Sequence, residues 1–194
     1  MLTDPFAYNK YRLERQFWRI LGASFRIYSP DNSLTFFVDQ RLALREDIHV
    51  YADESKAVEL LSIQARRILD FSAAYDVWDV RSGQKVGAFK RKGWSSLIRD
   101  SWIIMDMNDN EVGTILEDSQ LLALVRRFLT ELVPQKFHGT VLNSEVFHLS
   151  QHFNPFLFKM DLDYSMDATN VMDRRMGIAA AVLIAAIEGR QRSE

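Results

Sequence analysis

The sequence predicts a mainly β protein in which a closed antiparallel barrel of repeated hairpins encloses an apolar C-terminal helix. Three observations support this prediction: a hairpin pattern that recurs along the chain, a terminal segment without polar residues, and an apolar content large enough for a sizeable core. Of the 194 residues 47% are hydrophobic, among them 13 Phe and 4 Trp. A chain of this length and composition fits a single domain over residues 1–194.

The recurring pattern is an aromatic or aliphatic strand, a turn of Asp, Asn or Gly, and a second strand. Turn residues between alternating or β-branched runs are typical of hairpins. Equivalent places in the four repeats are held by Tyr28, Tyr51, Trp78 and Met105, which follow one another at intervals of 23, 27 and 27 residues. Such spacing indicates repeated supersecondary units. The four predicted hairpins cover residues 25–38, 49–63, 75–89 and 102–115.

Three more β segments complete the predicted barrel. A fifth hairpin is expected from Lys136 to Ser150 with its turn near residues 143–144, and a partner strand follows at 156–162. The stretch 11–17 is ambiguous, because its apolar residues fit one face of a helix as well as an alternating strand. We favour the strand.

Two segments depart from the β pattern and are predicted to be helices. Residues 118–133 form an amphipathic helix that Asp118 or Ser119 can cap and that Pro134 ends. Its apolar residues recur at helical spacing, at Leu121, Leu122, Val125, Phe128, Leu129 and Leu132. The terminal helix is predicted over residues 171–188, with Gly189 suited to ending it.

The terminal helix is apolar on nearly every side, so it must be buried on every side. In a small, mostly β protein the inside of a closed sheet is the place that surrounds a helix. Five alanines between residues 179 and 186 keep the helix thin, and its length of about 25 Å is comparable to the height of a barrel. The apolar run 177–187 is 11 residues long, whereas a transmembrane helix needs about 20. No transmembrane segment is therefore expected.

Composition excludes several classes of protein. A formal net charge of −2 is unlike that of a nucleic-acid-binding polycation, so no nucleic-acid partner is expected. The absence of cysteine excludes disulfides, thiolate metal sites, a cysteine nucleophile and palmitoylation. The first residues contain an early acid and no apolar stretch. We therefore expect no secretory signal and a cytoplasmic location, with peripheral attachment to a membrane as an option.

No motif for catalysis, metal or cofactor binding can be identified. The chain lacks a nucleophile elbow, a Walker loop and a dinucleotide-binding glycine motif. The segment 161–167 begins like a calcium-binding EF-hand, but Met166 and Met172 occupy the places of the required Gly and Glu. His148 and His152 have the four-residue spacing of a metal pair on a helix, yet they fall in a segment predicted to be strand and turn. The prediction is therefore no enzyme, no cofactor and no metal.

The best candidate site is a basic stretch. Between Arg81 and Arg99 the chain has six cations and no acid, and each cation near an anionic bilayer contributes about 1 kcal/mol. Alternatively, because successive residues of a strand point to opposite faces, some of these cations face solvent singly and others pair with acids of neighbouring hairpins. The predicted residues for an anionic ligand or membrane surface are Lys85, Lys90, Arg91, Lys92, Trp94, Arg99, Arg126 and Arg127.

The order of several motifs resembles the tubby C-terminal-like superfamily, in its LURP-one-related and phospholipid scramblase branch. The matching segments are 91–96, 100–106, 125–129, 154–156, 161–163 and 175–189. The resemblance covers residues 11–190 and implies a twelve-stranded barrel around a C-terminal helix. It also implies a lipid-related or signalling role, such as the phosphoinositide binding of tubby proteins or the calcium-linked lipid movement proposed for scramblases. This chain lacks the lipidated cysteine cluster of scramblases, and its calcium segment is poor.

The sequence therefore predicts a non-catalytic binding or scaffold protein that contacts an anionic phospholipid or a protein partner through an outer basic face. The alternative is a membrane-associated, scramblase-like lipid transporter. A third class, which carries a small ligand inside the barrel, is disfavoured because the terminal helix would fill the lumen.

Overall fold

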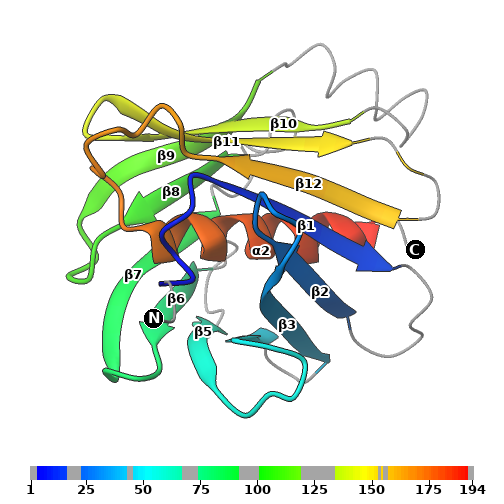
Figure 1. The fold of residues 1–194 in the computed structure, drawn as a ribbon. Helices are drawn as coiled ribbons and strands as arrows, with labels where there is room; N and C mark the ends of the chain where they lie inside the picture. Colours follow the sequence, from blue (N-terminus) through cyan, green and yellow to red (C-terminus); the bar gives the residue numbers. More distant parts are fainter. Residues whose placement is uncertain are drawn as a thin grey trace.

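The protein is a closed barrel of twelve antiparallel strands around one helix, as predicted (Figure 1). The computed structural model describes residues 4–16, 23–42, 46–66, 74–91, 101–118, 134–152, 154 and 157–191. In chain order the strands are β1 (Lys10–Gln16), β2 (Ala23–Tyr28), β3 (Leu34–Leu42), β4 (Glu46–Tyr51), β5 (Glu59–Ala65), β6 (Ala74–Asp79), β7 (Gln84–Arg91), β8 (Ser101–Met105), β9 (Glu111–Glu117), β10 (Lys136–Val141), β11 (Ser144–His152) and β12 (Leu157–Asp163).

Each strand pairs with its neighbours in the sequence, and β1 closes the barrel by pairing with β12. The closing register places Leu13 opposite Met160, and both side chains point into the core. The ambiguous stretch near residue 11 is therefore a strand. Closure leaves no unpaired sheet edge, which removes the main site of edge-to-edge aggregation.

Because the strands alternate in direction, the five tight turns of hairpins β2–β3, β4–β5, β6–β7, β8–β9 and β10–β11 lie at one end of the barrel. The loop 164–173 lies at the same end, which we call the turn end (Figure 1). Several residues in these turns adopt positive φ, among them Asn32, Gly83, Asp109 and Asn143. Gly, Asn and Asp tolerate this conformation best, which explains why they mark the hairpins in the sequence.

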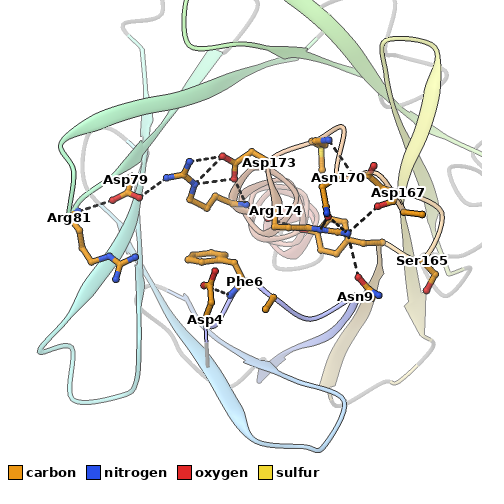
Figure 2. A pocket seen from close by; sticks show the side chains of 15 residues that line it. Asp4, Phe6, Asn9, Asp79, Arg81, Ser165, Asp167, Asn170, Asp173 and Arg174 are labelled. Carbon is orange, nitrogen blue, oxygen red and sulfur yellow. Dashed lines mark hydrogen bonds and ion pairs between the residues drawn. The ribbon is translucent and has the colours of Figure 1, made fainter. Parts of the chain in front are cut away.

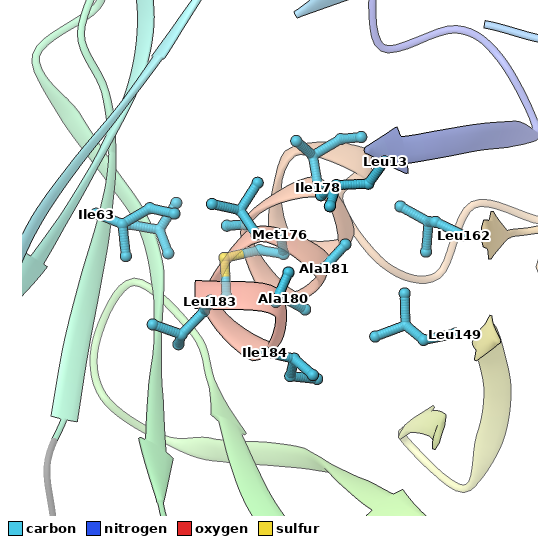
Figure 3. Packing of buried hydrophobic residues seen from close by; sticks show 14 of the residues in the cluster. Leu13, Ile63, Leu149, Leu162, Met176, Ile178, Ala180, Ala181, Leu183 and Ile184 are labelled. Atoms are coloured by element: carbon cyan, nitrogen blue, oxygen red, sulfur yellow. The ribbon is translucent and has the colours of Figure 1, made fainter. Parts of the chain in front are cut away.

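Helix α2 (Arg174–Gln191) runs through the lumen from the turn end (Figures 1 and 3). Between Met176 and Ala186 no described side chain is more than 4% exposed. Aliphatic residues of the helix pack against inward-facing strand residues such as Ile63, Leu149 and Leu162 (Figure 3). Where Met176 lies beside β7, the strand has Gly87, at which an added Cβ would lie 2.8 Å from the Met176 Cε atom. Within the described chain, no helix has the length and apolar character needed to span a bilayer.

The predicted bounds of the terminal helix were wrong at both ends. The helix begins at Arg174 rather than 171, because Asp173 accepts the N–H of Arg175 through its side chain and that of Met176 through its carbonyl. It continues past Gly189 to Gln191, so Gly189 does not end it.

The other predicted bounds were close. The turn of the fifth hairpin lies at Leu142 and Asn143, one residue earlier than predicted, and the last strand is β12 at Leu157–Asp163. Asp118 follows β9 and is not helical. The rest of the predicted amphipathic helix, residues 119–133, lies outside the described residues.

Leu142 is an unusual residue for its position. It has φ of 50° in a two-residue turn, and 71% of its surface is exposed. Left-handed backbone costs a bulky L-residue about 1–2 kcal/mol, whereas Asn adopts it more readily. We expect Leu142→Asn to raise the free energy of unfolding by about 0.5–1 kcal/mol, measured by urea denaturation. Met107→Asn, at a 55% exposed turn residue without positive φ, is the control; an equal gain there would contradict the explanation.

Candidate functional site

A pocket of about 870 Å³ opens at the turn end, where α2 enters the barrel (Figure 2). Three parts of the chain that are distant in sequence line it: the segment before β1, the β6–β7 turn, and the loop that leads from β12 into α2. Its charged lining residues are four acids and three arginines, namely Asp4, Asp79, Asp167, Asp173, Arg81, Arg174 and Arg175.

Arg175 joins two of these carboxylates on one side of the helix start. Its Nη1 lies 2.6 Å from Asp79 Oδ2, and its Nη2 lies 2.5 Å from Asp173 Oδ2. Asp79 also accepts the N–H groups of Arg81 and Ser82, each at 3.0 Å. Although burial alone would raise the pKa of Asp79, the Ser82 N–H and the Arg175 guanidinium lower it. Burial would also raise the pKa of Asp173, but the hydrogen bonds and positive charge of Arg175 lower it.

Arg174, the neighbouring residue, has no carboxylate partner in the part of the chain that the structure describes. Its Nε and Nη2 donate to Asn170 Oδ1 at 3.1 and 2.8 Å, and Nη2 also donates to the Asp167 carbonyl at 3.2 Å. The guanidinium lies over the Tyr164 ring, 4.3 Å from its centroid. Arg174 Nη1 is enclosed and has no acceptor among the described residues. In this part of the chain the charge of Arg174 is therefore solvated by neutral oxygens and an aromatic face.

The loop beneath Arg174 is held by buried groups. Tyr164 is 1% exposed and donates its hydroxyl hydrogen to the Arg174 carbonyl at 2.9 Å. Burial raises its pKa well above the ordinary value of 10. The Asp167 carboxylate accepts the N–H groups of Val171 and Met172 at 2.7 and 3.2 Å. Asp167 therefore acts as a structural cap of the loop.

Arg81 and Asp4 stand at the mouth of the pocket, on the β6–β7 turn and before β1. Both are exposed, and Phe6 lies close to them in the view of Figure 2. Within the described residues the Arg81 guanidinium forms no ion pair or hydrogen bond. The Asp4 carboxylate accepts one bond, from the Phe6 N–H at 3.0 Å. The mouth thus combines one guanidinium and one carboxylate, neither of which is paired with an opposite charge in this part of the structure.

The predicted basic face is partly neutralised. Lys85 pairs with Asp76 at 2.9 Å and with Asp109 at 2.6 Å, and Arg66 contacts both of these carboxylates. This network joins Arg66, which directly follows β5, to β6, β7 and the β8–β9 turn on the outer surface. Hydrogen bonds and charge from Lys85 and Arg66 lower the pKa of Asp109. The alternative interpretation, pairing with acids of neighbouring hairpins, therefore applies to Lys85.

The other predicted cations do not share one surface. Lys90 is opposite Ile103 and Ala74 on the outer face of the sheet, whereas Arg91 lies next to it on the opposite face, 6.0 Å from the ring centroid of core residue Trp102. The remaining predicted residues lie outside the described part of the chain: Lys92, Trp94, Arg99, Arg126 and Arg127.

The acids and histidines considered for metals are paired with protein groups. Asp161 lies on β12 and bonds His152 at 2.7 Å, and Asp163 pairs with Lys10 at 3.0 Å. His148 lies on β11, as predicted, and bonds Glu145 at 2.6 Å. Among the described residues, no group of three or more His, Cys, Asp or Glu is arranged to hold a metal ion.

The pocket at the turn end was not predicted from the sequence. Asn9 and Asn170 have no motif that marks them, and Asp79 reads as an ordinary turn residue. One signal was present: two arginines, Arg174 and Arg175, directly precede a helix that must be buried. Charges at that position have to lie where the helix enters the barrel, so they mark the turn end.

Comparison with known proteins found no match to the chain among family models, curated proteins or solved structures. The resemblance to the tubby-like superfamily therefore stays a prediction.

Proposed function

We propose that this protein is a non-catalytic binding module that takes its ligand at the turn end of the barrel. The observation that carries the proposal is the position of α2. Because its aliphatic side chains fill the lumen, a ligand has to bind outside the core, and the pocket at the helix start is a concave surface with convergent polar groups. Small-molecule ligands bind preferentially in concave surfaces where a few polar groups converge.

The protonation states of the pocket favour binding over catalysis. A general acid or base works best with a pKa near the working pH. Here hydrogen bonds and ion pairs lower the pKa of Asp79 and Asp173, and burial raises that of Tyr164. Each shift moves the pKa of its group further from pH 7. Asp79 and Asp173 therefore remain ionised and Tyr164 remains protonated at pH 7, which suits a site whose charges stay fixed.

The test is to fill the pocket. Ala168 lines it and is exposed, so Ala168→Trp places an indole in the pocket without disturbing the core. We expect saturation-transfer NMR with a panel of anionic, neutral and cationic small molecules to detect binding that Ala168→Trp abolishes. Ala57→Trp, at an exposed alanine of the β4–β5 turn outside the pocket, is the matched control and should bind as the wild type does. Absence of binding by every class of molecule would overturn the proposal.

A second candidate is attachment to an anionic bilayer through the outer basic face. The observation in its favour is Lys90, which points outward and pairs with no acid within the described chain. The paired state of Lys85 weakens this candidate, because a cation already neutralised by two carboxylates gains little from a phosphate. The scramblase-like alternative depends on the same surface and on the family resemblance alone.

A further inference from the structure

We infer that the ligand of the turn-end pocket is a small molecule or headgroup bearing an oxyanion, a phosphate or a carboxylate. This inference rests on the proposed function and names its ligand class. It starts from the hydrogen-bonding capacity that the pocket residues have left after their mutual contacts are counted.

The acids of the pocket are largely occupied. Asp79 and Asp173 share Arg175, and both oxygens of Asp167 accept backbone N–H groups. Among the described residues Asp4 is the lining carboxylate that still has free acceptor capacity, because it accepts a single N–H group. An incoming cation would therefore find one available carboxylate, at the exposed mouth.

Some donors of the pocket remain unoccupied. The Arg81 guanidinium has no partner within the described residues, whereas Arg175 is bound to Asp79 and Asp173. Arg174 has no carboxylate partner in the described chain, and because its Nη1 is enclosed it contributes positive charge to the pocket rather than a free donor. The side-chain amides of Asn9 and Asn170 accept hydrogen bonds from Arg174 through Oδ1, at 3.4 Å and 2.8 Å. Their NH₂ groups donate none within the described residues. The pocket thus offers the Arg81 guanidinium, the positive charge of Arg174 and two amide donors, which a ligand rich in oxygen acceptors would satisfy.

Oxyanions match this donor set better than other ligands. Guanidinium groups bind phosphate and carboxylate oxygens through charge-assisted hydrogen bonds that are about twice as strong as neutral ones. Because Arg174 is stacked on Tyr164 and held by Asn170, little of its conformational freedom remains to be lost on binding. The negative charge of Asp4 repels an anionic ligand. Removing that charge should therefore tighten the binding of an anion and not that of a cation.

The experiment is an isothermal titration with inorganic phosphate, glycerol 3-phosphate, glycerol and putrescine, in a buffer free of oxyanions. We expect binding of the two phosphates and no binding of glycerol or putrescine. Arg81→Gln should weaken phosphate binding at least tenfold, and Asp4→Asn should strengthen it by about threefold. Arg26→Gln is the control, because Arg26 is also partly exposed but pairs with Glu54 outside the pocket; its affinity should equal that of the wild type.

Vesicle flotation separates a lipid headgroup from a free oxyanion. If vesicles of phosphatidic acid in phosphatidylcholine carry the wild type but not Arg81→Gln, the oxyanion is a lipid phosphate; binding of phosphate without flotation assigns a free ligand. Flotation lost in Lys90→Glu but kept in Arg81→Gln would favour the outer face and overturn the inference. So would phosphate binding that Arg81→Gln and Arg174→Gln leave unchanged. Binding of glycerol or putrescine alone, blocked by Ala168→Trp, would refute the oxyanion and leave the proposed function standing.

Discussion

Deleting the chain after Ala168 is expected to leave a protein that does not fold cooperatively. The deletion removes α2, whose Ile178, Val182, Leu183 and Ile184 are 0–3% exposed. Burial of a Val, Leu or Ile side chain contributes about 1.5–3 kcal/mol, so these four contribute about 6–12 kcal/mol. That sum equals the whole net stability of an ordinary domain, about 5–15 kcal/mol. The strands would also surround an empty apolar lumen, whereas the interiors of folded proteins are close-packed.

The measurement is the loss of a cooperative urea transition and of near-ultraviolet circular dichroism. A full-length variant separates loss of the core from loss of chain length. Ala181 is 2% exposed in the lumen, and Ala181→Asp would bury a carboxyl group without a partner, at a cost comparable to the net stability of an ordinary domain. Ala57→Asp, at an exposed turn alanine, should unfold as the wild type does. A truncated chain that retains its cooperative transition would show that the helix is not the core of the barrel.

The barrel and its helix could be predicted because both depend on local patterns. Hairpins can be recognised by turn residues between β-branched runs, and a helix without a polar face has to be buried. The limits of the terminal helix could not be read in this way. The start depends on where Asp173 caps the helix, and a single glycine does not determine the end, because α2 continues through Gly189 to Gln191.

The pocket could not be predicted because it is a product of long-range register. Asn9 meets Arg174 across 165 residues, and Asp79 meets Arg175 across 96. Nothing in a local window relates these residues. The basic stretch could be recognised in the sequence, but the sequence did not show which of its cations are neutralised. The acids that pair with Lys85 come from neighbouring elements, Asp76 from β6 and Asp109 from the β8–β9 turn. Counting cations in one segment does not show which acids the fold brings beside them.

Gly177→Ala is expected to destabilise the protein, although glycine to alanine normally stabilises a helix by about 1 kcal/mol. A Cβ atom at Gly177 would lie 2.1 Å from the Tyr164 hydroxyl oxygen and 2.5 Å from its Cε1. Tyr164 cannot easily move away, because it is buried, bonded to the Arg174 carbonyl and covered by the Arg174 guanidinium. Overpacking of this kind costs about 1–3 kcal/mol. Set against the helix gain of about 1 kcal/mol, this leaves an expected net loss of about 1 kcal/mol, seen as a fall in Tm of about 2–4 °C.

A double-mutant cycle attributes the loss to this contact. Tyr164→Phe removes the nearest atom, so Gly177→Ala should cost less in the Tyr164→Phe background, with a coupling of about 1 kcal/mol. Because Tyr164 also supports Arg174, Gly177→Ala should weaken oxyanion binding at the pocket in parallel with its effect on stability. A Gly177→Ala protein that is more stable than the wild type would mean that α2 lies further from Tyr164 than described, and would remove the support on which the position of Arg174 depends.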